Sequence, residues 1–493
     1  MPSLRFADND YFLSGSFESD LMMESPVLID PKWKGTSLSK KLESIQTLPN
    51  LPGRFYLATS GSTGNPKLVA KDMSAMETEL GAWGALPEVT LLFANQPIDV
   101  HVPLCHLYGL IWGYFLPKLF GVTTAFGPSI DSNPRKREGE KPFHVGGEVR
   151  PITAVTTAEA LRSRVRIGLP LPKIAIVSGM KFPADLAKTL REKTHIQVFE
   201  IYGSTETGGI GFRDPLRQAR FQILPIVATQ TKGLLEENKE ATNEVELLVN
   251  SPYISRQIFT FSEFGEWREE ILDPNGYFET SDVGTQNDLG WYLLGRKDRI
   301  IKRKGKRVSL DTIEGEISEL IPGFDFVCVS LQLNSGQSFG LVTNFTDEHE
   351  LKEYLKINLP ESHFPEWIQF LEVLPKLPNG KWDRKEMELL FQKEIRMKNH
   401  LESLEANEVR EDIFRSVDPI QKIVQTVLKM DTKIEENSHL IYDYQMDSLQ
   451  FTEMVFLLER LVLKKFPEED RSLSYFYSIS GIREYLKEKI YLV

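Results

Sequence analysis

The chain has 493 residues, of which 41% are hydrophobic and 26% are charged, and its formal net charge is −12. A length prior of roughly 150 residues per domain predicts about three domains of ordinary globular composition. The negative charge argues against nucleic acid or an anionic membrane as a partner.

The N-terminus and the cysteine content predict a cytoplasmic protein. The first residues include acids and lack a basic segment followed by an apolar core, so we expect no signal peptide. No uncharged apolar stretch reaches the roughly 18 residues of a membrane span. Cys105 and Cys328 are the two cysteines, too few for a disulfide framework and in keeping with a reducing compartment.

From about residue 55 to residue 249, short apolar runs alternate with helical patterns. This alternation predicts an α/β layer with a largely parallel sheet. Binding residues in such sheets gather at the carboxyl ends of the strands. We expect strands at 55–59, 87–94, 122–127, 173–179 and 195–203, and helices at 73–86 and 183–193.

Four further segments follow. Strands and turns predominate in 244–296, and a smaller α+β unit occupies about 299–391. Residues 392–412 are highly charged and poor in apolar residues, which indicates a linker or an exposed helix. The last 80 or so residues have helical periodicity. We therefore predict a large α/β domain at 1–297, a small mobile α+β subdomain at 298–391, a linker at 392–412 and an all-α four-helix domain at 413–493.

The first motif is a loop rich in serine, threonine and glycine, SGSTGNPK, at residues 60–67. Glycine lets backbone N–H groups approach a ligand, hydroxyls add donors, and Lys67 adds a positive charge. Together they suit a polyphosphate. The loop differs from the common nucleotide P-loop, because Leu68 follows the lysine where that motif has serine or threonine.

Four later segments decide what this loop does. They are IYGSTETGG at 201–209, YFETSDVG at 277–284, GRKDRIIKRKGKRVSLDTIE at 295–314 and LPKLPNGKWDR at 374–384. In this order and spacing the five segments resemble the adenylate-forming superfamily: acyl-CoA and aryl-CoA ligases, peptide-synthetase adenylation domains and luciferases. The resemblance covers roughly residues 55–384.

The resemblance implies an ATP-dependent enzyme with Mg²⁺, in which a carboxylate attacks the α-phosphate to give an acyl-adenylate and pyrophosphate. Catalysis of this kind is chiefly positioning and charge stabilisation. The resemblance implies that Thr205 contacts the α-phosphate, that Glu206 holds Mg²⁺, and that the β- and γ-phosphates are held by Ser60, Gly61, Ser62, Thr63, Gly64 and Lys67. For the nucleoside, it implies that Tyr202 stacks on adenine, that Asp282 binds the ribose diol and that Arg296 contacts ribose or phosphate. For the acid, it implies that Lys381 bridges the carboxylate and the α-phosphate, that His106 of VPLCHLYGL helps to form the adenylate, and that the adenine and acyl pockets are lined by Ser178, Gly179 and Met180.

Each residue also has an ordinary structural interpretation. Asp282 could be a turn acid, Arg296 a surface cation, Lys381 a solvated hairpin residue, and His106 a half-buried histidine that opens a helix. A metal site at His101, Cys105 and His106 is not expected, because no second ligand pair of usable spacing follows.

The resemblance also implies a second step, in which the C-terminal part turns about a hinge at Asp298 and Gly305 lines the approach of a thiol. The tail segment YQMDSLQFTEMVFLLERL supplies a candidate. It resembles the phosphopantetheine attachment site of acyl and peptidyl carrier proteins, with the cofactor on Ser448 at a helix N-terminus. The alternative is that Asp447 or Ser448 simply caps the helix.

The expected function is therefore a ligase that activates a carboxylic acid and loads its own carrier domain. Its partners would be a phosphopantetheinyl transferase and a downstream acyltransferase, ketosynthase or similar enzyme in secondary-metabolite or lipid biosynthesis. One alternative is a ligase that uses free CoA, with the tail as a docking module. Another is a catalytically inactive ligase–carrier scaffold.

Several positions depart from the family pattern. Leu68, Ser281 and Gln445 stand where relatives often have glycine. Only 58 residues precede Thr59, so the N-terminal part of the large domain is shortened and its sheet edge needs other protection, dimerisation being one possibility. No aspartate that would hold an amino group is recognisable around Asp99–His106, which favours an acyl or aryl acid over an α-amino acid.

Overall fold

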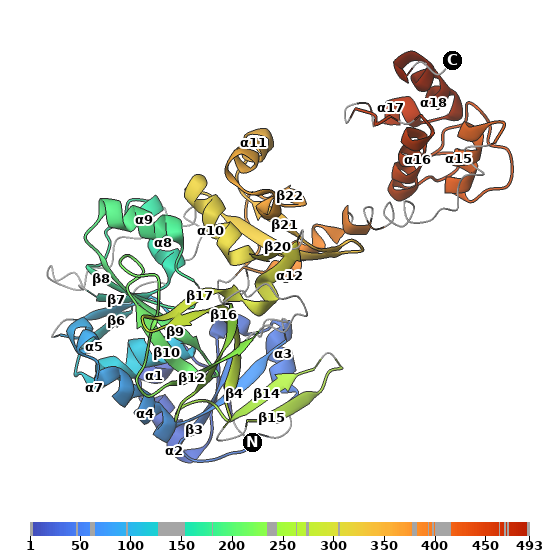
Figure 1. Cartoon of the computed structure of the whole chain (residues 1–493). Coiled ribbons are helices and arrows are strands. Elements are labelled where there is room, and N and C mark those ends of the chain that lie inside the picture. Colours follow the sequence, from blue (N-terminus) through green and yellow to red (C-terminus); the bar gives the residue numbers. More distant parts are fainter. Residues whose placement is uncertain are drawn as a thin grey trace. The chain divides into compact units, whose positions relative to one another are not determined.

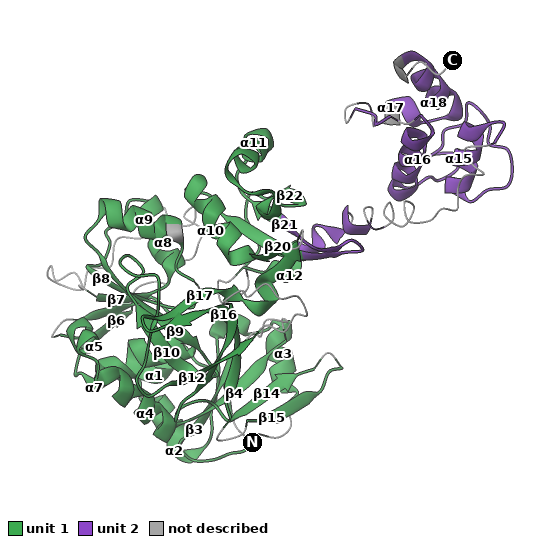
Figure 2. Cartoon of the chain, in the orientation of Figure 1, with its two compact units in different colours: residues 1–330, 341–387 green, residues 331–340, 388–493 purple. Residues whose placement is uncertain are grey.

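The computed structural model of the chain (Figure 1) describes residues 3–490 except 46–47, 60–64, 95–96, 127–152, 180, 234–243, 263, 273–275, 304–305, 377–381, 393, 397–398, 400–415, 463, 468–469 and 471–472. The chain divides into two compact units, residues 1–330 with 341–387 and residues 331–340 with 388–493 (Figure 2). Within the described ranges, no helix combines the length and the apolar character that crossing a membrane requires.

The N-terminal residues complete a six-stranded mixed sheet. Its strands, in spatial order, are β1 (Leu4–Phe6), β2 (Val27–Ile29), β3 (Arg54–Thr59), β4 (Lys67–Asp72), β14 (Gln257–Phe261) and β15 (Trp267–Ile271). β1, β2 and β3 run parallel, and the remaining pairs are antiparallel. The short N-terminal part thus covers the edge of β3 with two added strands. One outer strand is three residues long and the other carries charged side chains, both of which discourage pairing with another chain.

The second sheet has seven strands and is largely parallel, as predicted. Its order is β11 (Gln222–Ile223), β10 (Gly208–Arg213), β9 (Gln197–Ser204), β8 (Ile174–Val177), β7 (Thr153–Thr156), β5 (Ile98–Val100) and β6 (Thr124–Phe126). Pairing is parallel from β6 to β9 and antiparallel from β9 to β11. The strand predicted at 55–59 is β3, which belongs to the first sheet.

The strand predicted at 87–94 is wrong, because this segment forms helix α5 (Pro87–Leu92). Proline is well suited to the first helical position, since its missing N–H has no partner there in any case. Val89 and Leu92 are buried three residues apart, a helical spacing. A short apolar run does not distinguish a strand from a buried helix, and the opening proline was the local clue.

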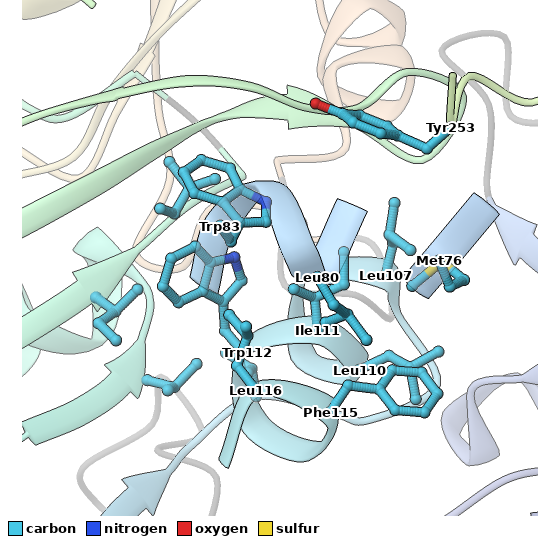
Figure 3. Packing of buried hydrophobic residues seen from close by; sticks show 14 of the residues in the cluster. Met76, Leu80, Trp83, Leu107, Leu110, Ile111, Trp112, Phe115, Leu116 and Tyr253 are labelled. Carbon is cyan, nitrogen blue, oxygen red and sulfur yellow. The ribbon is translucent and has the colours of Figure 1, made fainter. Parts of the chain in front are cut away.

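One hydrophobic core joins the two sheets (Figure 3). It contains Phe55 of β3, Phe199 of β9 and side chains of helix α4 (Met73–Gly84). Trp83 of α4 meets Trp112 edge to face, with ring centroids 5.0 Å apart, a geometry that aromatic pairs favour. Helices α6 (Leu107–Leu110) and α7 (Leu116–Leu119) flank the π-helical turn Ile111–Phe115 in the same core.

Helices α8 (Ala158–Arg166) and α9 (Ala184–Lys193) belong to another hydrophobic cluster of the parallel sheet. Ala175 and Val177 of β8 lie in that cluster, whereas Ile176 lies in the main core. Successive residues of a strand point to opposite faces, so this strand is buried on both sides, as is usual for parallel sheets.

A four-stranded antiparallel sheet follows, made of β12 (Ala228–Gly233), β13 (Val245–Asn250), β16 (Phe278–Asn287) and β17 (Gly290–Arg296). The following α+β elements are β18 (Ile300–Arg303), β19 (Lys306–Ser309), α10 (Leu310–Leu320), β20 (Phe326–Leu333), β21 (Gly336–Thr343), α11 (Glu348–Asn358), β22 (Trp367–Phe370) and α12 (Arg384–Leu389). β20, β21 and β22 form a three-stranded sheet.

The C-terminal helices have a hydrophobic core of their own. They are α15 (Pro419–Leu428), α16 (Ser448–Leu461), α17 (Leu473–Phe476) and α18 (Ile479–Tyr485), followed by a π-helical turn at Leu486–Ile490. Ile423, Met454, Leu458, Phe476 and Ile482 are among the buried members of this core. The helical periodicity of the tail is therefore confirmed, while the boundaries predicted for the domains stay a prediction.

Two of the positions where the family pattern favours glycine have a left-handed backbone. Ser281 has φ 59° and Gln445 has φ 55°. A residue with a side chain adopts this conformation at a free-energy cost of roughly 1–2 kcal/mol. Ser281 and Gln445 therefore have the backbone conformation that glycine would adopt more easily.

We expect Gln445→Gly to raise the local free energy of unfolding of the C-terminal helices by up to about 1 kcal/mol, because the relief of strain exceeds the added entropy of the unfolded chain. Hydrogen exchange of amides in α16, measured on the full chain by mass spectrometry, gives this quantity. Gln445→Ala keeps the strained backbone and is the control. Equal protection in both variants would contradict the prediction.

Candidate functional site

Tyr202 and Asp282 meet through a hydrogen bond. Tyr202 lies near the end of β9, and its hydroxyl donates to Oδ2 of Asp282 in β16 at 2.6 Å. The tyrosine ring packs against Phe221 with ring centroids 5.0 Å apart, and it is largely buried. The residues that the family resemblance assigns to adenine and to ribose are thus in direct contact.

Arg296 extends this group across the sheet. Asp282 and Arg296 face each other in the register of β16 and β17. Arg296 Nη1 lies 3.8 Å from Oδ1 of Asp282 and donates to the carbonyl oxygen of Thr280 at 3.0 Å. Its Nε lies 3.6 Å from Oδ1 of Asp298, the residue predicted at the hinge. A guanidinium between two carboxylates, with part of its surface exposed, is available to a ribose or a phosphate.

Burial raises the pKa of Asp282 to about 6, although the hydrogen bond from Tyr202 and the charge of Arg296 oppose this shift. Ribose hydroxyls donate hydrogen bonds, so they bind the ionised carboxylate better than the protonated acid. The carboxylate predominates above about pH 6. The affinity for the nucleotide should therefore increase as the pH rises through that value.

We expect the dissociation constant for ATP to fall by several fold between pH 5 and pH 7, with its steepest change near pH 6. Isothermal titration calorimetry across this range would measure it. The nucleotide's own phosphate also titrates, and Asp282→Asn provides the control for that contribution. An equal pH dependence in the wild type and in this variant would show that Asp282 does not accept the ribose hydroxyls.

Lys67 and Glu206 form a second contact of the site. Lys67 begins β4, and its Nζ lies 3.8 Å from Oε1 of Glu206 in the turn between β9 and β10. This turn also contains Thr205, and the N–H of Ser255 donates to the Glu206 carbonyl oxygen at 2.8 Å. Mg²⁺ is usually held by one or two carboxylates together with phosphate oxygens. Glu206 could hold the ion, and Lys67 could neutralise the phosphates.

A buried acid that sequence analysis missed fixes the same turn. The N–H of Gly209 donates to Oε1 of Glu79 at 2.7 Å, and the Tyr253 hydroxyl donates to the Gly209 carbonyl oxygen at 2.7 Å. A Cβ at Gly209 would come within 2.3 Å of Trp83, so this position accepts no side chain. Glu79 lies three residues after Met76 and four before Trp83, on the buried face of α4. An acid at such a position was the available sequence clue.

Lys71 is the second charged residue that sequence analysis missed. It is 2% exposed, and burial lowers its pKa to about 8 while the negative charges of Glu79 and Glu206 oppose this shift. A lysine within the apolar strand KLVAKD was the clue in the sequence. Its charge adds to that of Lys67 near the Glu206 turn.

Ser178 and His106 lie at the carboxyl ends of the parallel strands. Ser178 follows β8, and its hydroxyl donates to the carbonyl oxygen of Ile201 at 3.0 Å. Gly179 has φ 98°, a conformation suited to glycine. His106 is the N-cap residue of α6, and in this helix the Tyr108 hydroxyl donates to the Ile176 carbonyl oxygen at 2.6 Å. Both motifs therefore occupy the edge of the sheet where ligands usually bind.

His106 is half-buried and contacts an acid from the N-terminal segment. Its Nε2 lies 3.1 Å from Oδ2 of Asp30. Asp30, Cys105 and His106 also form the one group of three possible metal ligands among the described residues, with their atoms within 4.8 Å of one another. His101 pairs instead with Asp99, with Nε2 and Oδ2 2.7 Å apart. Burial raises the pKa of the Cys105 thiol well above its usual range, which disfavours the thiolate that metals require.

Ser448 is the exposed first residue of α16 in the second unit. The cap of this helix is Asp447, whose Oδ1 accepts the N–H of Gln450 at 2.8 Å while the Gln450 side chain accepts the N–H of Asp447 at 3.0 Å. Because Asp447 and Gln450 cap the helix, the hydroxyl of Ser448 is not needed as a cap in the described part of this unit.

Some of the predicted site residues fall outside the described residues, and their roles stay predictions. They are Ser60, Gly61, Ser62, Thr63, Gly64, Met180, Gly305 and Lys381.

Comparisons with known proteins indicate the family to which this chain is similar. A family model described as AMP-binding enzyme matches residues 54–258. The chain is 25% identical over 344 residues to 4-coumarate–CoA ligase of Cereibacter sphaeroides, which covers 68% of this chain and 71% of that protein. It is also 25% identical over 344 residues to the long-chain-fatty-acid–CoA ligase FadD13 of Mycobacterium tuberculosis, covering 66% of this chain and 65% of that ligase, slightly less than two thirds of its length.

Among solved structures, the fold resembles o-succinylbenzoate CoA synthetase (MenE) from Bacillus subtilis in complex with the acyl-adenylate intermediate OSB-AMP. The TM-score is 0.57 at 16% identity, covering 78% of this chain and 88% of that one. At this identity the likeness establishes the fold. The family match also supports ATP as the nucleotide. The match over residues 54–258 supports the AMP-binding enzyme family of the adenylate-forming superfamily, and the enzyme class is that of the AMP-forming acid–thiol ligases.

Proposed function

We propose that this chain activates an acyl or aryl carboxylic acid as its adenylate and then transfers the acyl group to a phosphopantetheine thiol on its own Ser448. In the first step a carboxylate oxygen attacks the α-phosphorus of ATP, and the bond to the bridging oxygen breaks to release pyrophosphate. In the second, the thiol sulfur attacks the acyl carbon, AMP leaves with the bonding electron pair, and the thiol proton passes to solvent.

The observation that carries the first step is the contact between residues of four separate segments. Tyr202 donates to Asp282 at 2.6 Å, Arg296 lies 3.8 Å from that carboxylate, and Lys67 lies 3.8 Å from Glu206. This arrangement offers a ribose acceptor, a carboxylate for Mg²⁺ and cations for the phosphates. Catalysis of phosphoryl chemistry depends mainly on such positioned charges.

The observation that supports the second step is the exposed hydroxyl of Ser448 at the start of a fourteen-residue helix that Asp447 caps. A cap serine would be expected to accept a hydrogen bond from the helix backbone, and here the aspartate takes that role. An exposed serine at a helix N-terminus is well placed to carry an anionic phosphodiester.

The second candidate function is a ligase that uses free CoA. It is favoured by the relatives, because 4-coumarate–CoA ligase and FadD13 are both named as CoA ligases. In that case the C-terminal helices would be a docking module. The third possibility, an inactive scaffold, is disfavoured because Lys67, Glu206, Asp282, Arg296 and Lys381 are all present in the sequence.

The test is the intact mass of the full chain, first after CoA and a broad-specificity phosphopantetheinyl transferase, and then after ATP, Mg²⁺ and a pool of benzoate, cinnamate and straight-chain acids from butyrate to dodecanoate. We expect one phosphopantetheine increment followed by one acyl increment, whose mass identifies the acid. If no first increment forms but acyl-CoA accumulates in solution, the free-CoA function is correct. Absence of both products and of ATP–pyrophosphate exchange would support the scaffold.

A further inference from the structure

We infer that Asp30 is a positioning residue for adenylate formation, acting through His106. This inference rests on the proposed function, since it gives His106 a part in the first step. Asp30 comes from the N-terminal segment outside the five motifs, and sequence analysis assigned it no role.

The carboxylate of Asp30 is buried, with 2% of its side chain exposed. Its Oδ1 accepts the N–H of Lys32 at 2.9 Å, and its Oδ2 lies 3.1 Å from Nε2 of His106. Burial raises the pKa of this carboxyl, but the hydrogen bonds from His106 and from the Lys32 N–H outweigh burial and leave the pKa below its usual value. The group is therefore a carboxylate at neutral pH, and one of its oxygens faces the imidazole.

This contact settles how the imidazole is oriented. An ionised carboxylate can only accept, so Nε2 of His106 must carry the proton. The ring is then held in one tautomer and one rotation, with Nδ1 left for another partner. Thirty per cent of the His106 side chain is exposed. Fixing the tautomer of a working histidine is a known task of a buried aspartate.

The Asp30 carboxylate lies at the carboxyl ends of β2 and β3. In the register of β2 and β3, Leu28 pairs with Leu57. Asp30 directly follows β2, and Thr59, two residues after Leu57, ends β3, so Asp30 lies at the carboxyl end of this strand pair. His106 is the N-cap residue of α6. In this helix the Tyr108 hydroxyl donates to the carbonyl oxygens of Thr156 and Ile176, which lie at the ends of β7 and β8. Asp30 thus links the carboxyl edges of the two sheets through His106.

A purely structural role for Asp30 is the competing explanation, because Asp30 also caps the short 3₁₀ helix Pro31–Trp33. Asparagine caps a helix as well as aspartate does. Asp30→Asn therefore keeps the cap and the volume but removes the charge. Its amide can also present an N–H to Nε2, which would favour the wrong tautomer of His106.

The experiment is a double-mutant cycle of Asp30→Asn and His106→Ala in the full chain. The readout is ATP–pyrophosphate exchange with the pool of benzoate, cinnamate and straight-chain acids. We expect Asp30→Asn to lower kcat by at least roughly 10- to 100-fold, the loss typical when the partner that orients a metal-ligating histidine is removed, with KM for ATP changed by less than about twofold. We expect the double variant to equal His106→Ala, since Asp30 acts through that residue.

Asp8→Asn is the matched control, because Asp8 caps α1 (Asn9–Leu13) in the same N-terminal segment by accepting the N–H of Tyr11 at 3.0 Å. It should leave kcat unchanged. If Asp30→Asn fails to fold, Asp30→Ser keeps a capping oxygen and should show the same loss. Unchanged kcat in Asp30→Asn, or an equal further loss in the His106→Ala background, would overturn the inference. Absence of exchange in the wild type would instead refute the proposed function.

Discussion

Replacing Ser448 with alanine is expected to remove all covalently bound acyl group from the chain and to leave ATP–pyrophosphate exchange within about twofold of wild type. The hydroxyl is the only atom group lost, and it is the proposed site of phosphopantetheine. The helix should survive, because Asp447 and Gln450 form the capping box, and surface substitutions outside such features usually change stability by less than about 0.5 kcal/mol. Intact mass spectrometry and an exchange assay give the two readouts.

Ser438→Ala is the control for this prediction, since it removes a hydroxyl from the same helical unit, where that hydroxyl contacts Glu435 at 3.4 Å. It should be loaded like the wild type. A phosphopantetheine increment that persists in Ser448→Ala would place the modification at another residue. Loss of exchange in the same variant would show that Ser448 serves the adenylation step instead.

Replacing Lys381 with alanine is expected to lower ATP–pyrophosphate exchange by about 10²- to 10³-fold, the effect of removing one positioned donor from a developing charge. The family resemblance assigns this lysine to the carboxylate and the α-phosphate together. Lys385→Ala removes the same charge from an exposed residue four positions later and is the matched control. Exchange that stays at the wild-type rate in Lys381→Ala would show that the adenylation lysine has been assigned wrongly.

Mixing these two variants would decide whether loading occurs within one chain or between chains. Lys381→Ala keeps the proposed carrier serine but lacks the adenylation lysine, and Ser448→Ala has the reverse defect. Acyl groups on the Lys381→Ala chain would show transfer from one molecule to another. If acylation occurs only in the wild type, the enzyme loads its own carrier.

The sequence alone was sufficient for those features that depend on local patterns. Alternating apolar runs predicted the parallel strands β6, β8 and β9 and the helices α4 and α9, because hydrophobic periodicity follows the geometry of each element. Ordered motifs predicted that Tyr202, Glu206, Asp282 and Arg296 belong to one site, and three of these residues, Tyr202, Asp282 and Arg296, lie together in the structure. The prediction failed at Pro87–Leu92, where an apolar run fits a strand or a buried helix equally well and only packing decides.

Tertiary structure decided the contacts between segments far apart in the chain. His106 and Asp30 are 76 residues apart, and Gly209 and Glu79 are 130 apart, so no local pattern relates them. The pairing of β1 and β2 with β3 was equally hidden, since three-residue strands carry little periodicity. Residue types determined which chemistry this chain can perform. Long-range packing determined which buried charges contact the candidate site residues, because such charges are tolerated only where the fold supplies their partners.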